Sequence, residues 1–247
     1  MATSKINKKT NWNPTDKRFV AFLDILGFRD LVMRSSHSKI YDLLTDLSKK
    51  RSSLESIENY TALPERFSDA GLYTASFSDS IFIFSKNASV ENFELFSLMT
   101  SWFFAQVIEK QIPIKGAIAV GDISINKSNQ IYFGQPIIDA FLLEEELSYL
   151  GVVCHNSIDE YLSSIPDENL FKQRYMDIFT PFKYGLISHL NINWFIESKY
   201  YDEGPRKENL KYRINELRKQ TSGNPRRYID NTIKIIDEIY SIQNLPS

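Results

Sequence analysis

The chain has 247 residues, of which 43% are hydrophobic and 13% are aromatic, and this is enough apolar material for a large folded core. A formal net charge of −2 provides no broad positive field for nucleic acid, and no apolar run is long enough to cross a bilayer. The single cysteine, Cys154, excludes an internal disulfide, and three histidines are too few for a histidine-rich zinc site. Because the N-terminus is polar and lacks a signal-peptide core, we expect a cytoplasmic protein without a nucleic-acid partner or membrane insertion.

The first half of the chain alternates between strand and helix patterns. Residues 1–16 are polar, and we expect a flexible N-terminus there. Residues 19–26 (FVAFLDIL) form a continuous apolar run, which is typical of a strand buried on both faces. Apolar residues at helical spacing follow Gly27. Residues 73–79 and 80–85 then read as two strands that meet in a tight hairpin at Ser78-Asp79-Ser80.

The pattern continues with a long amphipathic helix over residues 90–110, for which Asn87 or Ser89 is the expected N-cap. A strand over 112–125 and a helix that begins at Pro136 come next. Residues 151–162 read as a short strand followed by a short helix.

This order of elements predicts an α+β fold with a ferredoxin-like βαββαβ core. The tail differs, because residues 179–195 look β-like and two helices follow them. We therefore expect three parts along the chain: a flexible N-terminus (1–16), a main α+β domain (17–165) and a C-terminal extension with terminal helices (166–247).

Two acidic residues stand in apolar strand contexts. Asp24 lies near the end of the first strand, and Asp79 lies at the hairpin tip. In a sandwich of this order the first strand is next to the hairpin, so the two carboxylates can converge. Paired carboxylates are suitable ligands for Mg²⁺ or Mn²⁺, which also bind phosphates. They are not the ligands that zinc prefers. The opposing interpretation is that each aspartate merely caps a helix or a turn.

The segment after Asp24 turns at Gly27 and enters a helix at Phe28. Backbone N–H groups at the start of a helix bind phosphate well. A metal site and a phosphate site are thus expected at the same corner of the sheet.

Several motifs occur in the order found in one enzyme family. DILGF (24–28) matches the D-I-x-G-F signature of class III nucleotidyl cyclases, and the hairpin SFSDSIF occupies the place of that family's second metal aspartate. KGAIAVGD (115–122) resembles the family's R-x-G-I-x-x-G strand. YFGQPIIDAFLLEEE (132–146) resembles its W-G-x-x-V-N-x-A-x-R-x-E helix. The resemblance covers about residues 19–150.

The departures from the family pattern concern the end of the site that reads purines. A family threonine is replaced by Arg29, and the helix Asn and Arg fall on Ile138 and Leu142. The positions that select a purine base fall on Ala75 and Ile131. The retained metal end, and a tail reading TPFKYG and then NINW, resemble the pyrimidine cyclases of Pycsar anti-phage defence.

The resemblance implies a homodimeric uridylate or cytidylate cyclase. Such an enzyme converts UTP or CTP into 3′,5′-cyclic UMP or cyclic CMP, which a separate effector reads as an infection signal. Asp24, Asp79 and the Ile25 carbonyl would hold two Mn²⁺ or Mg²⁺ ions per active site, and Gly27 and Phe28 would bind phosphates.

Tyr73 and Lys115 are the candidates for contacting the pyrimidine base. For Tyr73 the opposing interpretation is a core or edge tyrosine, and for Lys115 it is a structural ion pair. Two other functions stay open for the chain as a whole. One is a purine nucleotide or diguanylate-type cyclase, and the other is a catalytically silent, nucleotide-sensing dimer.

Overall fold

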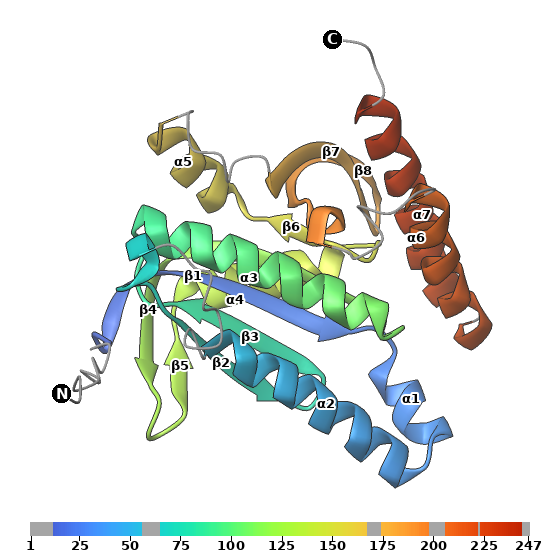
Figure 1. The fold of residues 1–247 in the computed structure, drawn as a ribbon, viewed down its shortest axis with the longest axis horizontal. Coiled ribbons are helices and arrows are strands. Elements are labelled where there is room, and N and C mark those ends of the chain that lie inside the picture. The colour runs from blue at the N-terminus through green and yellow to red at the C-terminus, as the bar shows by residue number, and fades with distance from the viewer. Residues whose placement is uncertain (1–11, 56–64, 167–173, 198–205, 222, 244–247) are drawn as a thin grey trace, which may run out of the picture.

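The computed structural model describes residues 12–55, 65–166, 174–197, 206–221 and 223–243. One mixed sheet runs through this part of the chain, with the order β2-β3-β1-β4-β6-β8-β7 and with β5 paired to β4 (Figure 1). Its strands are β1 (Thr15–Ile25), β2 (Leu72–Phe77), β3 (Ser80–Ser85), β4 (Ile114–Asn126), β5 (Ile131–Phe133), β6 (Val152–Cys154), β7 (Tyr175–Phe182) and β8 (Gly185–Ile192).

Helices cover both faces of this sheet, so the expected α+β class is confirmed. The α-helices are α1 (Phe28–Arg34), α2 (His37–Glu55), α3 (Val90–Glu109), α4 (Gln135–Glu146), α5 (Asn156–Ser164), α6 (Arg206–Glu216) and α7 (Asn224–Gln243). Short 3-10 helices are η2 (Glu65–Phe67), η4 (Trp194–Glu197) and η5 (Leu217–Gln220).

The central strand β1 is buried because it pairs on both edges. It runs antiparallel to β3 and to β4, and residues Phe19 to Leu23 are at most 3% exposed. The order β2-β3-β1-β4 is that of the expected ferredoxin-like core. The continuous apolar run in this strand therefore reflects burial on both faces, as the sequence predicts.

The two faces of the sheet are covered differently. On one face the ring of Phe19 packs against Phe93 and Phe96 of α3, at centroid distances of 4.6 and 5.7 Å. On the other face Phe22 contacts Phe141 of α4 at 5.4 Å. Because side chains alternate between faces along a strand, Asp24 shares the α4 face with Phe22.

The local signals in the sequence are largely confirmed. Ser89 is the N-cap of α3, and its hydroxyl accepts a hydrogen bond from the Asn92 N–H. Pro136 lies in the first turn of α4. The hairpin strands end at Phe77 and restart at Ser80, so the expected first strand, 73–79, is two residues too long at the turn.

The N-terminal boundary of the first strand also differs from the expectation. Strand β1 begins at Thr15, within the segment expected to be flexible, because its first residues pair with the long end of β4. The Ile125 N–H extends this pairing by donating to the Pro14 carbonyl at 2.7 Å. Residues 1–11 lie outside the described part of the chain.

The C-terminal extension continues the sheet. Strand β6 pairs parallel with β4, β8 pairs with β6, and β7 forms the edge. Helix α7 attaches through side chains that reach backbone groups of the segment after α4: Asn231 donates to the Ser148 carbonyl, and Thr232 accepts from the Leu150 N–H, both at 2.8 Å. Among the described residues, no helix has the length and apolar character needed to cross a membrane.

Candidate active site

Asp24 is held at the end of β1, where strand pairing fixes its backbone on both sides. It lies opposite Ser80 of β3 and Lys115 of β4. The Ser80 hydroxyl donates a hydrogen bond to its Oδ1 at 3.0 Å. The carboxylate is half-buried, so its position is defined while one side stays open to solvent.

Asp79 reaches the same corner through the hairpin turn between β2 and β3. Ser78 takes a positive φ of 56°, a backbone conformation that tight hairpin turns use. The Asp79 carbonyl then accepts a hydrogen bond from the Ile25 N–H at 3.3 Å. The structure therefore brings Asp24, Ile25 and Asp79 together, although Asp24 and Asp79 are far apart in sequence.

The electrostatics at Asp24 are unfavourable for its charge. Burial raises the pKa of Asp24, the hydrogen bond from Ser80 lowers it, the neighbouring charge of Asp79 raises it, and Lys115 lowers it. The net direction is upward. The charge of Asp79 thus acts against that of Asp24, and among the described residues neither carboxylate forms an ion pair with a side-chain cation.

The turn after β1 places the two expected phosphate ligands beside these carboxylates. Gly27 has a φ of 73°, in the left-handed region that favours glycine, and it is the N-cap of α1. The first N–H groups of a helix have no partner within the helix, so those of Gly27 and Phe28 are available to a ligand. Helix α1 has only seven residues, so any phosphate affinity here comes from these N–H groups more than from a helix dipole.

Lys115 lies beside Asp24 in register, but its ammonium turns toward α4. Its Nζ lies 3.0 Å from Oε1 of Glu144 and donates to the Glu144 carbonyl at 2.7 Å. Lys115 and Glu144 are 6% and 3% exposed, respectively. This contact is the structural ion pair that the sequence left open for Lys115, and a role in base binding stays a prediction.

Glu144 is not fully compensated by this pair. Burial raises the pKa of Glu144 to about 7, and the opposing effect of Lys115 does not restore the ordinary value. Better-aligned hydrogen bonds from the ammonium go to the Glu144 and Leu147 carbonyls, which leaves the carboxylate held mainly by charge.

Tyr73, the other candidate for base contact, lies on the same face as Asp24. In register it pairs with Phe84, opposite Val20, so it is four residues along the strands from the Asp24–Ser80 level. At about 3.3 Å per residue this separation is about 13 Å.

The hydroxyl and one ring face of Tyr73 are already engaged. Its hydroxyl hydrogen-bonds that of Tyr132 at 2.7 Å, and the ammonium of Lys127 lies 4.3 Å from its ring centroid. Both contacts agree with the edge-tyrosine interpretation, and base contact by Tyr73 stays a prediction.

The donors present fit a hard divalent cation. Two carboxylates and the nearby Ile25 backbone are oxygen donors, and the unfavourable charge on Asp24 is what a cation would relieve. Among the described residues there is no cluster of three or more His, Cys, Asp or Glu side chains arranged for a metal. The remaining ligands would have to be phosphate oxygens and water.

Sequence reasoning missed the partners of the candidate residues. The sequence pattern identifies Ser80 only as part of the hairpin turn, and it identifies Glu144 only as part of the helix motif at 132–146. For Ser80 a signal exists, because it flanks Asp79 and faces the neighbouring strand. For Glu144 the only signal is an acidic residue on the buried side of α4, which requires the packing of α4 to be known.

Comparisons with known proteins add the following. No protein-family model and no curated protein sequence matches the chain. Among solved structures, it is similar to a bacterial light-regulated adenylyl cyclase, with 12% identity, a TM-score of 0.48, and coverage of 83% of this chain and 100% of that one.

Two further structures are similar to the chain. The adenylyl cyclase CyaB from P. aeruginosa is 14% identical with a TM-score of 0.46, over 72% of this chain and 94% of that one. The guanylate cyclase domain of RhGC from Catenaria anguillulae, in complex with GTP, is 13% identical with a TM-score of 0.46, over 72% of this chain and 96% of that one. All three TM-scores are below 0.5, so these similarities do not assign a function to this chain.

Proposed function

We propose that the protein is a nucleotidyl cyclase that converts UTP, or CTP, into the 3′,5′-cyclic monophosphate and pyrophosphate. The observation that carries the proposal is the convergence of Asp24 and Asp79 at the β1–α1 turn. The sequence motifs DILGF and SFSDSIF place the same two residues at the metal positions of class III cyclases.

Each residue then has a defined task. Asp24, Asp79 and the Ile25 carbonyl would hold two Mn²⁺ or Mg²⁺ ions, which would supply charge neutralisation and acidify the ribose 3′-hydroxyl. The N–H groups of Gly27 and Phe28 hold the β- and γ-phosphates. With the triphosphate fixed, the 3′-hydroxyl would lose its proton to water, the 3′-oxygen would attack the α-phosphorus in line, and the bond to pyrophosphate would break.

A homodimer would complete the site. Helix α4 carries three large apolar side chains, Ile138, Phe141 and Leu142, that are 42–53% exposed. At the hairpin, Phe77 is 84% exposed on the face that bears Asp24. Exposed apolar groups gathered near a functional face favour a partner surface, and two of these residues replace polar family residues.

The pyrimidine preference and the role in anti-phage defence complete the proposal. They are supported by apolar residues at the purine-reading positions, Ala75 and Ile131, and by the tail motifs. The cyclic product would act through a separate effector that recognises it. Two alternatives stay open to the test below. A purine or diguanylate product would indicate that type of cyclase, and absence of any product would favour a silent nucleotide-sensing dimer.

The test is incubation of the protein with each of the four nucleoside triphosphates and Mn²⁺, with products resolved by mass spectrometry. Asp79→Ala is the parallel control. We expect the wild-type protein to form cyclic UMP or cyclic CMP and the variant to form neither. A purine product would preserve the cyclase assignment and overturn the pyrimidine one, and turnover that persists in Asp79→Ala would contradict the metal site.

A further inference from the structure

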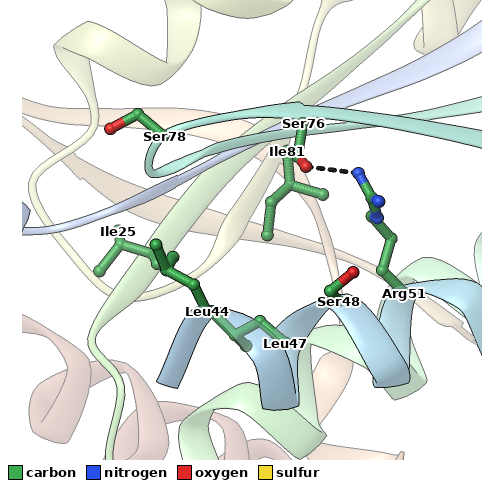
Figure 2. A pocket seen from close by; sticks show the side chains of 8 residues that line it. All are labelled: Ile25, Leu44, Leu47, Ser48, Arg51, Ser76, Ser78 and Ile81. Atoms are coloured by element: carbon green, nitrogen blue, oxygen red, sulfur yellow. Dashed lines mark hydrogen bonds between the residues drawn. The ribbon is translucent and has the colours of Figure 1, made fainter. Parts of the chain in front are cut away.

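A cavity of about 220 Å³ lies behind the candidate active site, between α2 and the tip of the β2–β3 hairpin (Figure 2). Its walls are largely apolar, with Ile25, Leu44, Leu47 and Ile81 around it. By the alternation of side chains Ile81 and Ile25 project from the face opposite Asp24, so this cavity is separate from the carboxylate pair.

A single cation lines the cavity at its polar end. Figure 2 shows the guanidinium of Arg51, on α2, directed at the Ser76 hydroxyl, with which Nη1 forms a hydrogen bond. The Nε of Arg51 is buried and has no hydrogen-bond partner among the residues that the structure describes. Within the described part of the chain no carboxylate forms an ion pair with Arg51.

The acidic residue best placed to neutralise Arg51 is already engaged. Glu55 is one helical turn further along α2, but its Oε1 accepts a hydrogen bond from the Thr74 N–H at 2.8 Å. The Nε of this guanidinium is a charged donor, and a buried charged donor without a partner is costly. An anionic group that reached Arg51 would supply the missing charge-assisted hydrogen bonds.

We propose that this cavity binds a small amphipathic carboxylate, with its carboxylate on Arg51 and its apolar body against Leu44, Leu47 and Ile81. The hydroxyls of Ser48 and Ser76 lie at the Arg51 end of the cavity and can donate to the same carboxylate, whereas Ser78 lies at the hairpin turn, away from Arg51. The apolar walls select against inorganic phosphate or pyrophosphate, whose surfaces are polar on every side.

A second cavity also borders α2 and serves as a comparison for the first. It has a volume of about 150 Å³ and shares Leu47, but its lining includes the carboxylate of Asp46 as well as Lys50 and Lys110. An anion entering it would be repelled by Asp46 and attracted by both lysines, whereas Arg51 is the charged side chain that lines the first cavity. Lys50 therefore offers a matched control, because it is a cation on the same helix next to Arg51 that lines the other cavity.

The test is calorimetric titration of the full chain with octanoate, octanol and pyrophosphate as probes. We expect octanoate to bind more tightly than octanol, and Arg51→Gln to weaken octanoate binding about tenfold or more, which corresponds to about 1.4 kcal/mol. Lys50→Gln removes the same charge from the same helix and should leave the affinity within about twofold.

A second variant tests the apolar part without touching Arg51. Ser48 is exposed at the cavity, so Ser48→Phe should block octanoate while the protein stays folded, and Ser48→Ala should not. Absence of octanoate binding, equal losses in Arg51→Gln and Lys50→Gln, or unchanged binding in Ser48→Phe would each overturn the proposal. So would pyrophosphate that competes with octanoate for Arg51. None of these measurements depends on cyclase turnover.

Discussion

Asp24, on β1, and Glu144, on the helix α4 that covers this face of the sheet, are both acidic, and they differ in which groups lie next to their charge. Glu144 is 3% exposed and has Lys115 at 3.0 Å. Asp24 is half-buried, accepts a hydrogen bond from the Ser80 hydroxyl, and is repelled by Asp79. A cation that the chain supplies lies against the first carboxylate and offsets part of the cost of its burial. A cation from solution would relieve the second, which is the basis on which we propose Asp24 as a metal ligand.

The largest expected effect comes from removing the unbalanced charges. Asp24→Asn and Asp79→Asn should each lower cyclase activity by on the order of 100-fold or more, the scale of losing one charge-stabilising group from an active site. The free energy of unfolding without metal should stay equal or rise slightly, because a repulsive pair is relieved. Product assays and urea unfolding measure the two quantities. A large loss of stability instead would make these aspartates structural.

Breaking the balanced pair should have the opposite signature. Lys115→Met leaves Glu144 buried without its cation, and we expect the free energy of unfolding to fall by about 3–5 kcal/mol. The double variant Lys115→Met/Glu144→Met should recover most of that loss, because it leaves no buried charge. Urea unfolding of the single and double variants checks this. If the double variant is no better than the single one, the pair is not the source of the cost.

The pair also gives the protein a pH-dependent stability. The pKa of Glu144 is raised from 4.5 to about 7, so the folded state keeps its proton at pH values where the unfolded chain has lost it. The stability from this group is complete below its ordinary pKa and is lost as pH rises to about 7. The loss is up to about 3 kcal/mol at about 1.4 kcal/mol per pH unit.

The comparison that isolates this group is wild type against Glu144→Gln, with unfolding followed from about pH 5 to about pH 8. Wild type should lose stability relative to the variant over this interval. A difference that stays constant with pH would show that Glu144 titrates at the same pH in both states.

The smallest effect concerns the hydrogen bond that orients Asp24. Ser80→Ala removes the donor at 3.0 Å from its carboxylate, and we expect a loss of about 1 kcal/mol of stability and up to about tenfold in turnover. Ser76→Ala, on the opposite face of the same hairpin, is the control for turnover. Equal turnover in the two variants would mean that Ser80 does not position Asp24.

The sequence predicts the parts of this comparison that depend on local pattern. The apolar run of β1, the hairpin tip at Asp79 and the cap at Ser89 are all visible as periodicity or turn chemistry, and the strand–helix order predicts that Asp24 and Asp79 meet. Lys115 is recognisable as a charge that needs a partner. Its choice of Glu144 is not, because this depends on how α4 lies across β4.

Two other features of the structure cannot be predicted from the sequence pattern. The β-like tail gives no indication that β8 will pair with β6, since any exposed strand edge offers the same backbone groups. The cavity beside Arg51 arises from the angle between α2 and the hairpin, and neither segment shows it alone.

The pairing of β1 with both β3 and β4 also has a consequence for synthesis of the protein. As the ribosome releases the chain, Asp24 emerges early, but its strand lacks its second neighbour until β4 has been made. An apolar strand with an open edge is prone to join other chains. Nascent molecules should therefore be most vulnerable to aggregation before β4 emerges, and a translational pause there would be more harmful than one after Asn126.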